Sequence, residues 1–373
     1  MRGSFAKVGI PFPRWYANPV YEWDNNNKQW KTQTIYPIYN LKPETTNSLE
    51  FGLQTKLFNH FNLDVTYYVT RTYNQTFNPD ISVSSGYSAL YIQTGDVSNK
   101  GIELSLGYNK KWGNFVWSTN YTLSANKNKI NELVRNYVHP ETGVIINKDR
   151  LVMGGLGNAK FILKEGGTLG DLYSTVDIKR DSEGKVYVDN NGTVFRNNNV
   201  GEIYLGSVLP KSNMAWRNDF SYKGFNFGFM ITSRFGGIVY SATQATLDKY
   251  GVSESSAAAR DKGYVLVNGE DRISPEAWYS AIGQADGIPQ YYTYSATNIR
   301  LQEAIFGYTF KKKQLFGLGE LSLSIVGRNL LFLYCKAPFD PESTATTGNY
   351  YQGIDRFMTP STRNIGFNVK LKF

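Results

Sequence analysis

The sequence contains little of what enzymes and disulfide-stabilised domains use. Its 373 residues include one cysteine, Cys335, and two histidines, His60 and His139. A single cysteine excludes an intramolecular disulfide framework and any zinc site built from several cysteines. Two histidines far apart in the chain leave little for a histidine-based metal site or a catalytic triad. The residues therefore predict no catalytic, metal or cofactor-binding site.

Long apolar runs and charged residues are also scarce. No stretch approaches the roughly 18 consecutive apolar residues of a membrane-spanning helix. Charged residues make up 19% of the chain, below the roughly 25% usual in soluble domains. Aromatic residues, in contrast, reach 15%, and there are 35 glycines. This composition excludes a disordered chain and favours a large all-β protein.

The N-terminus lacks the apolar run of about 7–15 residues that follows the basic residue of a secretory signal. The segment Met1–Gly9 instead resembles the middle of a strand. From this feature alone we expect either a cytoplasmic protein or a piece of a longer chain.

Alternation of apolar and polar residues is the clearest pattern. A period of two is typical of a strand with one face in apolar surroundings and the other in water. The strands that contain the alternating segments are expected to run about nine to eleven residues, enough for a tilted strand to cross hydrocarbon, whereas soluble strands average about five to six. A long soluble β-sandwich is the alternative. The segments are Leu49–Leu57, Leu63–Val69, Ile102–Tyr108, Phe115–Leu123, Phe225–Ile231 and Ile365–Phe373.

Short and long connections take turns between these segments, as in bacterial outer-membrane barrels with tight periplasmic turns and long outer loops. The short links lie near Asn59–His60, Lys111–Gly113, Lys223–Gly224 and Lys312–Gln314. The long polar segments are Ile10–Asn47, Asn74–Val97, Ala125–Asn213, Gly236–Asn298 and Arg328–Arg363. We therefore predict an all-β, antiparallel transmembrane β-barrel wall of roughly ten strands, ending on the periplasmic side. Aromatic residues near strand ends are expected to form a girdle: Tyr108, Trp117, Tyr121, Trp216 and Tyr222.

Several segments resemble, in order along the chain, motifs of the SusC/RagA family of TonB-dependent outer-membrane transporters. They are Arg2–Gly9 (RGSFAKVG), Leu41–Gly52 (LKPETTNSLEFG), Asn99–Leu104 (NKGIEL), Phe220–Phe225 (FSYKGF), Arg234–Gly237 (RFGG), Gly327–Leu330 (GRNL) and Phe339–Glu342 (FDPE). The resemblance implies that residues 1–373 form the C-terminal half of a 22-stranded barrel with long extracellular loops. It also implies that the family's signal peptide, plug domain and first barrel half are absent from this chain.

The resemblance implies a function and partners as well. The intact molecule is expected to import a bulky nutrient, an oligosaccharide or a peptide, in a TonB-dependent manner. A SusD-like surface lipoprotein would capture the substrate, and the TonB complex would act through the missing N-terminal part. Outer-membrane lipid and the barrel-assembly machinery are the other expected partners. A passive porin and a soluble all-β carbohydrate-binding protein remain alternatives.

Candidate contact residues follow from this interpretation. Arg217, Asp219 and Arg234 are predicted to face the lumen, where they would touch substrate or form ion pairs within the wall. Outer-loop aromatic residues are predicted to stack on sugar rings or to pack against the lipoprotein. They are Trp15, Trp23, Trp30, Tyr291, Tyr292, Tyr350 and Tyr351. Phe373, a terminal aromatic residue, resembles the signal that the barrel-assembly machinery recognises.

Other patterns have ordinary explanations. The net charge of +9 is spread along the chain, so no nucleic-acid partner is expected. The acidic segments Asp181–Gly184 and Asp189–Gly192 lack the spacing of a calcium-binding EF-hand. They flank Lys185–Val188 and are interpreted as hairpin turns of an outer loop, with calcium binding as the alternative.

Overall fold

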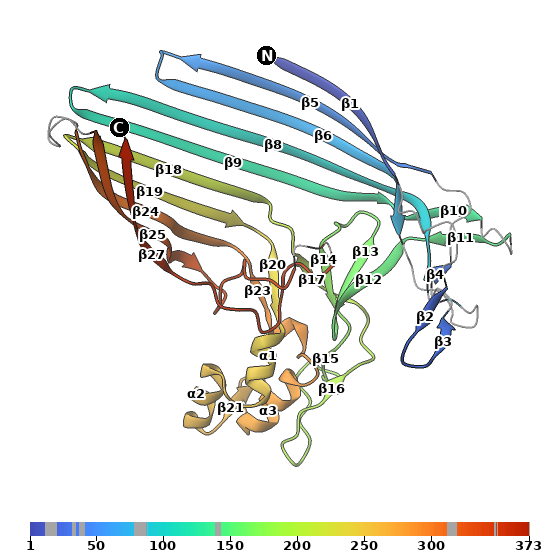
Figure 1. The fold of residues 1–373 in the computed structure, drawn as a ribbon. Coiled ribbons are helices and arrows are strands. Elements are labelled where there is room, and N and C mark those ends of the chain that lie inside the picture. Colours follow the sequence, from blue (N-terminus) through green and yellow to red (C-terminus); the bar gives the residue numbers. More distant parts are fainter. Residues whose placement is uncertain are drawn as a thin grey trace.

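The computed structural model describes residues 1–11, 21–31, 35–36, 42–77, 87, 89–138, 143–311, 319–346, 348 and 350–372. Ten long strands form one antiparallel sheet in which neighbours along the chain are neighbours in the sheet. The sheet curves into a wall, and both termini lie near its short-turn end (Figure 1). The wall strands are β1 (Arg2–Ile10), β5 (Glu44–Leu57), β6 (Phe61–Phe77), β8 (Ile92–Trp112), β9 (Phe115–Glu132), β18 (Ser212–Tyr222), β19 (Phe225–Phe235), β24 (Asn298–Phe310), β25 (Glu320–Cys335) and β27 (Asn364–Lys372).

The predicted strand number and connection pattern are confirmed. Short turns join β5 to β6, β8 to β9 and β18 to β19 at the expected positions. The fourth short link, Lys312–Gln314, lies outside the described residues. The predicted strand length is wrong for several strands, since β6, β8 and β9 have 17, 21 and 18 residues. They continue beyond the length that crosses a bilayer because they keep pairing with each other as the stems of the outer loops.

The cross-strand register places the apolar residues on one face of the wall. Leu104 of β8 lies opposite Val65 of β6 and Leu123 of β9. A second row crosses the C-terminal half of the sheet and consists of Phe227, Phe306, Ile325 and Phe367, all exposed. Exposed large apolar side chains over a whole sheet face are typical of a surface that contacts lipid. The alternation predicted from the sequence is thus present in three dimensions.

Aromatic residues gather near the short turns, as expected for a girdle. The rings of Tyr108 and Trp117 lie 5.2 Å apart, and Trp117 stacks on Phe220 at 6.3 Å. Tyr222 ends β18 beside the turn. The prediction is wrong for Trp216 and its cross-strand partner Tyr121, because Trp216 lies in the middle of β18. Its indole nitrogen donates to Thr119 Oγ1 at 3.0 Å.

The opposite end of the wall carries the long loops, which fold into a layer of small sheets and helices (Figure 1). Its strands are β2 (Glu22–Asp24), β3 (Gln29–Lys31), β4 (Ile35–Tyr36), β7 (Ala89–Leu90), β10 (Val134–Val138), β11 (Ile145–Lys148), β12 (Arg150–Leu156), β13 (Ala159–Lys164), β14 (Asp171–Ser174), β15 (Asp177–Ile178), β16 (Arg196–Asn197), β17 (Ile203–Ser207), β20 (Ile238–Ser241), β21 (Val265–Val267), β22 (Asp271–Ile273), β23 (Thr293–Ser295) and β26 (Ile354–Asp355). Two clusters of buried apolar residues form the core of this layer.

Helices in the loop between β19 and β24 were not predicted. They are α1 (Ala242–Lys249), α2 (Glu254–Lys262), α3 (Pro275–Gly283) and the 3₁₀ helix η2 (Pro289–Tyr291). Each α-helix begins after a serine whose hydroxyl accepts a backbone N–H two or three residues into the helix: Ser241, Ser253 and Ser274. Serine at the N-cap, with proline at the next position in α3, is the usual start signal. No helix among the described residues is long and apolar enough to cross a membrane.

The two faces of the wall provide the first prediction. Nitroxide labels at Leu104 and at its neighbour Glu103, in the full-length protein reconstituted into bilayers, should differ in accessibility. The label at Leu104 should be quenched more strongly by lipid-soluble oxygen, and the label at Glu103 by a water-soluble nickel chelate. This follows because successive strand residues point to opposite faces. Equal accessibility to the aqueous quencher at both positions would contradict the assignment of the faces.

Candidate functional site: the polar face of the wall and the loops above it

The polar face of the wall lines a hollow of about 970 Å³. Arg2 of β1 reaches this hollow and pairs with Asp64 of β6, Nη2 to Oδ1, at 3.2 Å. Glu103 of β8 and Asn120 of β9 also line it. Because charged and amide side chains cover this concave face and apolar ones cover the other, the polar face is the inner, water-facing side.

Arg217 and Asp219, both predicted to face the lumen, lie on this inner face of β18. Their side chains form two hydrogen bonds of 2.8 and 3.0 Å, and Arg217 Nη1 also reaches Glu303 Oε1 at 3.2 Å. Glu303 in turn accepts from Arg328 Nε at 3.1 Å. Ion pairing within the wall, one of the two alternatives for these residues, is therefore present. Their contact with substrate stays a prediction.

Arg217, Asp219, Glu303 and Arg328 form one series of ion pairs across the wall, which we call the charge ladder. Glu303 has the least exposed side chain of the four, at 13%, and the sequence analysis did not single it out. A β-bulge lies in β24 between Leu301 and Glu303. Leu301 lies opposite Ile231 on the lipid face, but Glu303 lies opposite Met230 on the inner face. Because the bulge adds one residue to β24, Leu301 and Glu303 point to opposite faces although they are two residues apart. Strict alternation counted from Leu301 would have placed Glu303 on the lipid face.

Arg234, the third predicted lumen residue, lies at the outer end of β19 and holds a loop rather than an opposing charge. Its Nη2 donates to the carbonyl oxygen of Val208 at 2.9 Å. Gly236 and Gly237 follow with φ angles of 76° and 80°, which favour glycine. A Cβ at Gly237 would also lie 3.0 Å from the Val208 carbonyl oxygen. The RFGG motif therefore turns the chain away from the wall at a point where it lies close to the loop that contains Val208.

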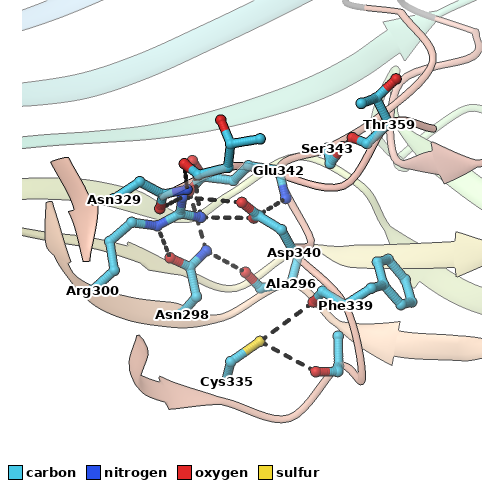
Figure 2. Close-up of polar contacts among 12 residues, drawn as sticks. Ala296, Asn298, Arg300, Asn329, Cys335, Phe339, Asp340, Glu342, Ser343 and Thr359 are labelled. Carbon is cyan, nitrogen blue, oxygen red and sulfur yellow. Dashed lines mark hydrogen bonds and ion pairs between the residues drawn. The ribbon is translucent and has the colours of Figure 1, made fainter. Parts of the chain in front are cut away.

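A buried ion pair ties the last outer loop to the wall (Figure 2). Arg300 of β24 forms two bonds to Asp340, 2.7 Å from Nη2 to Oδ1 and 3.1 Å from Nη1 to Oδ2. The two side chains are each 7% exposed. Asn329 Oδ1 accepts from Arg300 Nη1 at 3.2 Å, and Glu342 Oε2 lies 3.4 Å from Nη2. The guanidinium carbon also lies 4.6 Å from the centre of the Phe332 ring.

This cluster explains two motifs at once. Asn329 of the GRNL segment has a φ angle of 52°, and its amide donates to the Thr362 carbonyl oxygen at 3.1 Å. The FDPE segment supplies Asp340 and Glu342, and the Glu342 N–H bonds back to Asp340 Oδ1 at 3.0 Å. The two motifs meet around Arg300, which the sequence analysis did not single out. The only pattern in the sequence that could have pointed to Arg300 is an arginine at the start of a strand that follows a long loop.

Tyr350 and Tyr351, both predicted to contact ligand, have different environments. Tyr350 packs against both core clusters of the loop layer. Burial, and to a lesser extent the charge of Glu44, raises the pKa of Tyr350 to about 12. Tyr351 is half exposed. Of the two, Tyr351 is the one that a ligand can reach without rearrangement of the layer.

The other aromatic candidates divide in the same way. Trp23 and Trp30 face each other across the β2–β3 hairpin at 5.4 Å, and both are exposed. Tyr292 is buried in the core, and Tyr291 packs against Trp278 at 5.5 Å. Trp15 and Phe373 lie outside the described residues. Binding by the exposed pair and the assembly role of Phe373 stay predictions.

The acidic loop segments form hairpin turns, as predicted. Gly184 and Gly192 have φ angles of 82° and 75°, and their N–H groups donate to the carbonyl oxygens of Asp181 and Asp189. The Asp181 and Asp189 carboxylates accept backbone N–H groups within the same turns. Among the described residues no group of three or more potential metal ligands is found.

Comparison with known proteins agrees with the architecture. The family model for the TonB dependent receptor-like β-barrel matches residues 14–330. TonB-dependent receptor P3 of Formosa agariphila is 27% identical over 366 residues, covering 90% of this chain and 34% of its own length. TonB-dependent receptor SusC of Bacteroides thetaiotaomicron is 25% identical, covering 90% of this chain and 32% of SusC. The chain thus spans about a third of the length of these curated relatives.

Solved structures show the same fold. The RagAB peptide transporter superposes with a TM-score of 0.72 over 100% of this chain and 40% of the matched chain, at 15% identity. A second structure, of the RagAB peptide importer in the closed-closed state, gives a TM-score of 0.68. At these identities the likeness concerns the fold alone.

The curved antiparallel wall, with one apolar and one polar face, defines the class as an outer-membrane β-barrel. With most of its length matched, the chain belongs to the TonB-dependent receptor-like β-barrel family, and it resembles the SusC and RagA members as predicted. Its location is therefore the outer membrane, as predicted, and of the two alternatives that the N-terminus left open the cytoplasmic one is wrong. The single curved sheet likewise differs from a soluble β-sandwich.

The buried cluster provides the second prediction. Arg300→Met should leave the Asp340 carboxylate buried without its partner, at a cost of about 3–5 kcal/mol. Hydrogen exchange of residues 336–346 in the full-length protein should become much faster, because this segment loses its tie to β24. Arg328→Met is the matched control. Its pair with Glu303 is exposed at the arginine, so the loss should stay below about 1 kcal/mol. Similar exchange in both variants would refute the tethering role of Arg300.

Proposed function

We propose that the protein of which this chain is a part imports a bulky nutrient, an oligosaccharide or a peptide, across the outer membrane. Import is energised through TonB and assisted by a SusD-like surface lipoprotein. This chain supplies part of the barrel wall and the outer loops. The observation that carries the proposal is a wall with a polar, ion-paired inner face in a chain of this receptor family.

The edges of the wall support a larger barrel. Within the described residues β1 pairs only with β5, and β27 pairs only with β25. Lipid offers no hydrogen-bond partner to a strand edge, and each unsatisfied backbone group costs several kcal/mol. Further strands must therefore cover both edges in the membrane. The 22-stranded barrel that the family resemblance implies is wide enough for a bulky solute, and barrels of that strand number carry a plug.

The loop layer supports a surface partner. Its packed core gives the loops a defined shape above the wall, so they can present a docking surface without first becoming ordered. Tyr250 and Val252 lie between α1 and α2, and 68% and 67% of these residues are exposed. Helices α1 and α2 lie at the end of the loop layer away from the wall (Figure 1), and exposed apolar side chains between them suit burial against the lipoprotein.

Import itself yields the third prediction. Deleting the gene in its host should abolish uptake of a labelled oligosaccharide or peptide pool, and wild-type uptake should stop when TonB is removed. A passive porin would continue to conduct without TonB, because diffusion needs no energy coupling. A product that fractionates without detergent would support the soluble alternative instead.

Partner binding yields the fourth prediction. The double variant Tyr250→Ser/Val252→Ser should retain the lipoprotein at least about tenfold more weakly in co-purification from detergent, because two apolar side chains no longer become buried. Phe58→Ser, at an exposed short turn on the opposite end of the wall, is the control and should retain it fully. Equal retention in the two variants would place the lipoprotein elsewhere.

A further inference from the structure

Four lysines gather on the outer end of the wall. The import function does not account for them, and only Lys100 belongs to a family motif, NKGIEL. We call Lys100, Lys127, Lys129 and Lys211 the lysine cluster. Lys100 belongs to β8, Lys127 and Lys129 belong to β9, and Lys211 directly precedes β18. All four are exposed.

The register places like charges next to each other. Lys100 of β8 lies directly opposite Lys127 of β9. Like charges at directly opposed positions destabilise a sheet. Within the part of the chain that the structure describes, no lysine of the cluster takes part in a salt bridge. The two acidic residues of β8 do not neutralise it: Asp96 is held by Arg71 and Asn131, and Glu103 lines the hollow of the inner face. The repulsion is therefore uncompensated by the protein.

The cluster surrounds a hollow. All four lysines line a cavity of about 1250 Å³ at the point where the outer part of β9 separates from β18. Its other lining residues are apolar, glycine, hydroxyl or amide residues, and the described lining contains no aspartate or glutamate. Tyr67, Tyr204 and Thr168 contribute ring and hydroxyl groups. Four positive charges without a negative one make this a site for an anion.

The strand parity points Lys100, Lys127 and Lys129 toward lipid rather than toward the lumen, whereas Lys211, one residue before the lipid-facing Ser212, has the opposite parity. Ile102 and Ala125 lie opposite each other on the lipid face, and Lys100 and Lys127 lie two residues further along the same strands on that same face. Two residues correspond to roughly 7 Å along a strand. The inner face of this region carries Asn99 and Asn128 instead, which are hydrogen-bonded to each other at 3.0 Å. Lys100, Lys127 and Lys129 therefore border the apolar band at the height of the outer headgroups.

We propose that the lysine cluster binds the phosphate groups of a glycolipid in the outer leaflet. Lysine ammonium groups are compact donors for phosphate, and basic residues at the membrane border attract anionic headgroups. The acyl chains would lie along Tyr67 and Ile102 on the lipid face, and the bound phosphate would remove the repulsion between Lys100 and Lys127. This proposal depends on the membrane location of the wall and not on the imported substrate.

The test uses the full-length protein in detergent and purified diphosphoryl lipid A as the probe. Native mass spectrometry or a fluorescence titration should show binding to the wild type that weakens by at least about tenfold in K100S/K127S/K129S. Dephosphorylated lipid A should bind the wild type as weakly, and raising the salt concentration should weaken the diphosphoryl complex. The last two measurements need no variant, so they remain decisive if the triple variant fails to fold.

The matched control is K110S/K111S/K223S, which removes the same three charges beside the short turns at the other end of the wall. It should bind diphosphoryl lipid A as the wild type does, and heat-modified mobility on gels should confirm that both triple variants are folded. Equal binding by K100S/K127S/K129S and the control would overturn the proposal. Inorganic phosphate competing as strongly as lipid A would assign the hollow to a soluble anion and would also overturn it.

Discussion

The wall depends on one constraint: every backbone group within the bilayer must bond to a neighbouring strand, because lipid offers no alternative partner. Continuous pairing fixes the register from β1 to β27, and a slip of one residue would exchange the two faces. The register therefore decides which side chains meet lipid and which meet water. Even the bulge in β24 obeys this rule, since it moves Glu303 to the inner face while Leu301 stays in lipid.

The sequence predicted the strands of the wall well for the same reason. In a strand with one lipid face, an apolar residue indicates that its position faces lipid. Alternation alone therefore located the segments around Leu53, Leu104 and Phe227. The outer layer has no such rule. Its helices are short, and their start signals at Ser253 and Ser274 involve only single residues in a polar, glycine-rich loop. Glu303 was not singled out because residues 298–310 were not among the alternating segments, and the bulge breaks the parity between Leu301 and Glu303.

The motifs that carried the family resemblance are explained by packing and not by substrate recognition. Gly101 of the NKGIEL segment leaves room for the ring of Tyr68, which a Cβ would approach within 2.4 Å. Glu44 of the LKPE segment accepts the N–H of Thr76 at 2.8 Å, and GRNL meets FDPE around Arg300. Each motif joins a strand to a neighbour or a loop to the wall. They identify the architecture, but they carry no information on what passes through it.

The distribution of charge separates two roles within one sheet. On the inner face Arg217, Asp219, Glu303 and Arg328 neutralise each other in one continuous ladder. Paired charges keep the inner wall polar while holding its strands in place. On the outer rim the lysine cluster takes part in no salt bridge within the described residues. Unpaired charge persists in a folded protein where solvent or a ligand compensates it. The paired charges thus lie on the inner face, and the lysine cluster lies where the wall leaves the apolar band.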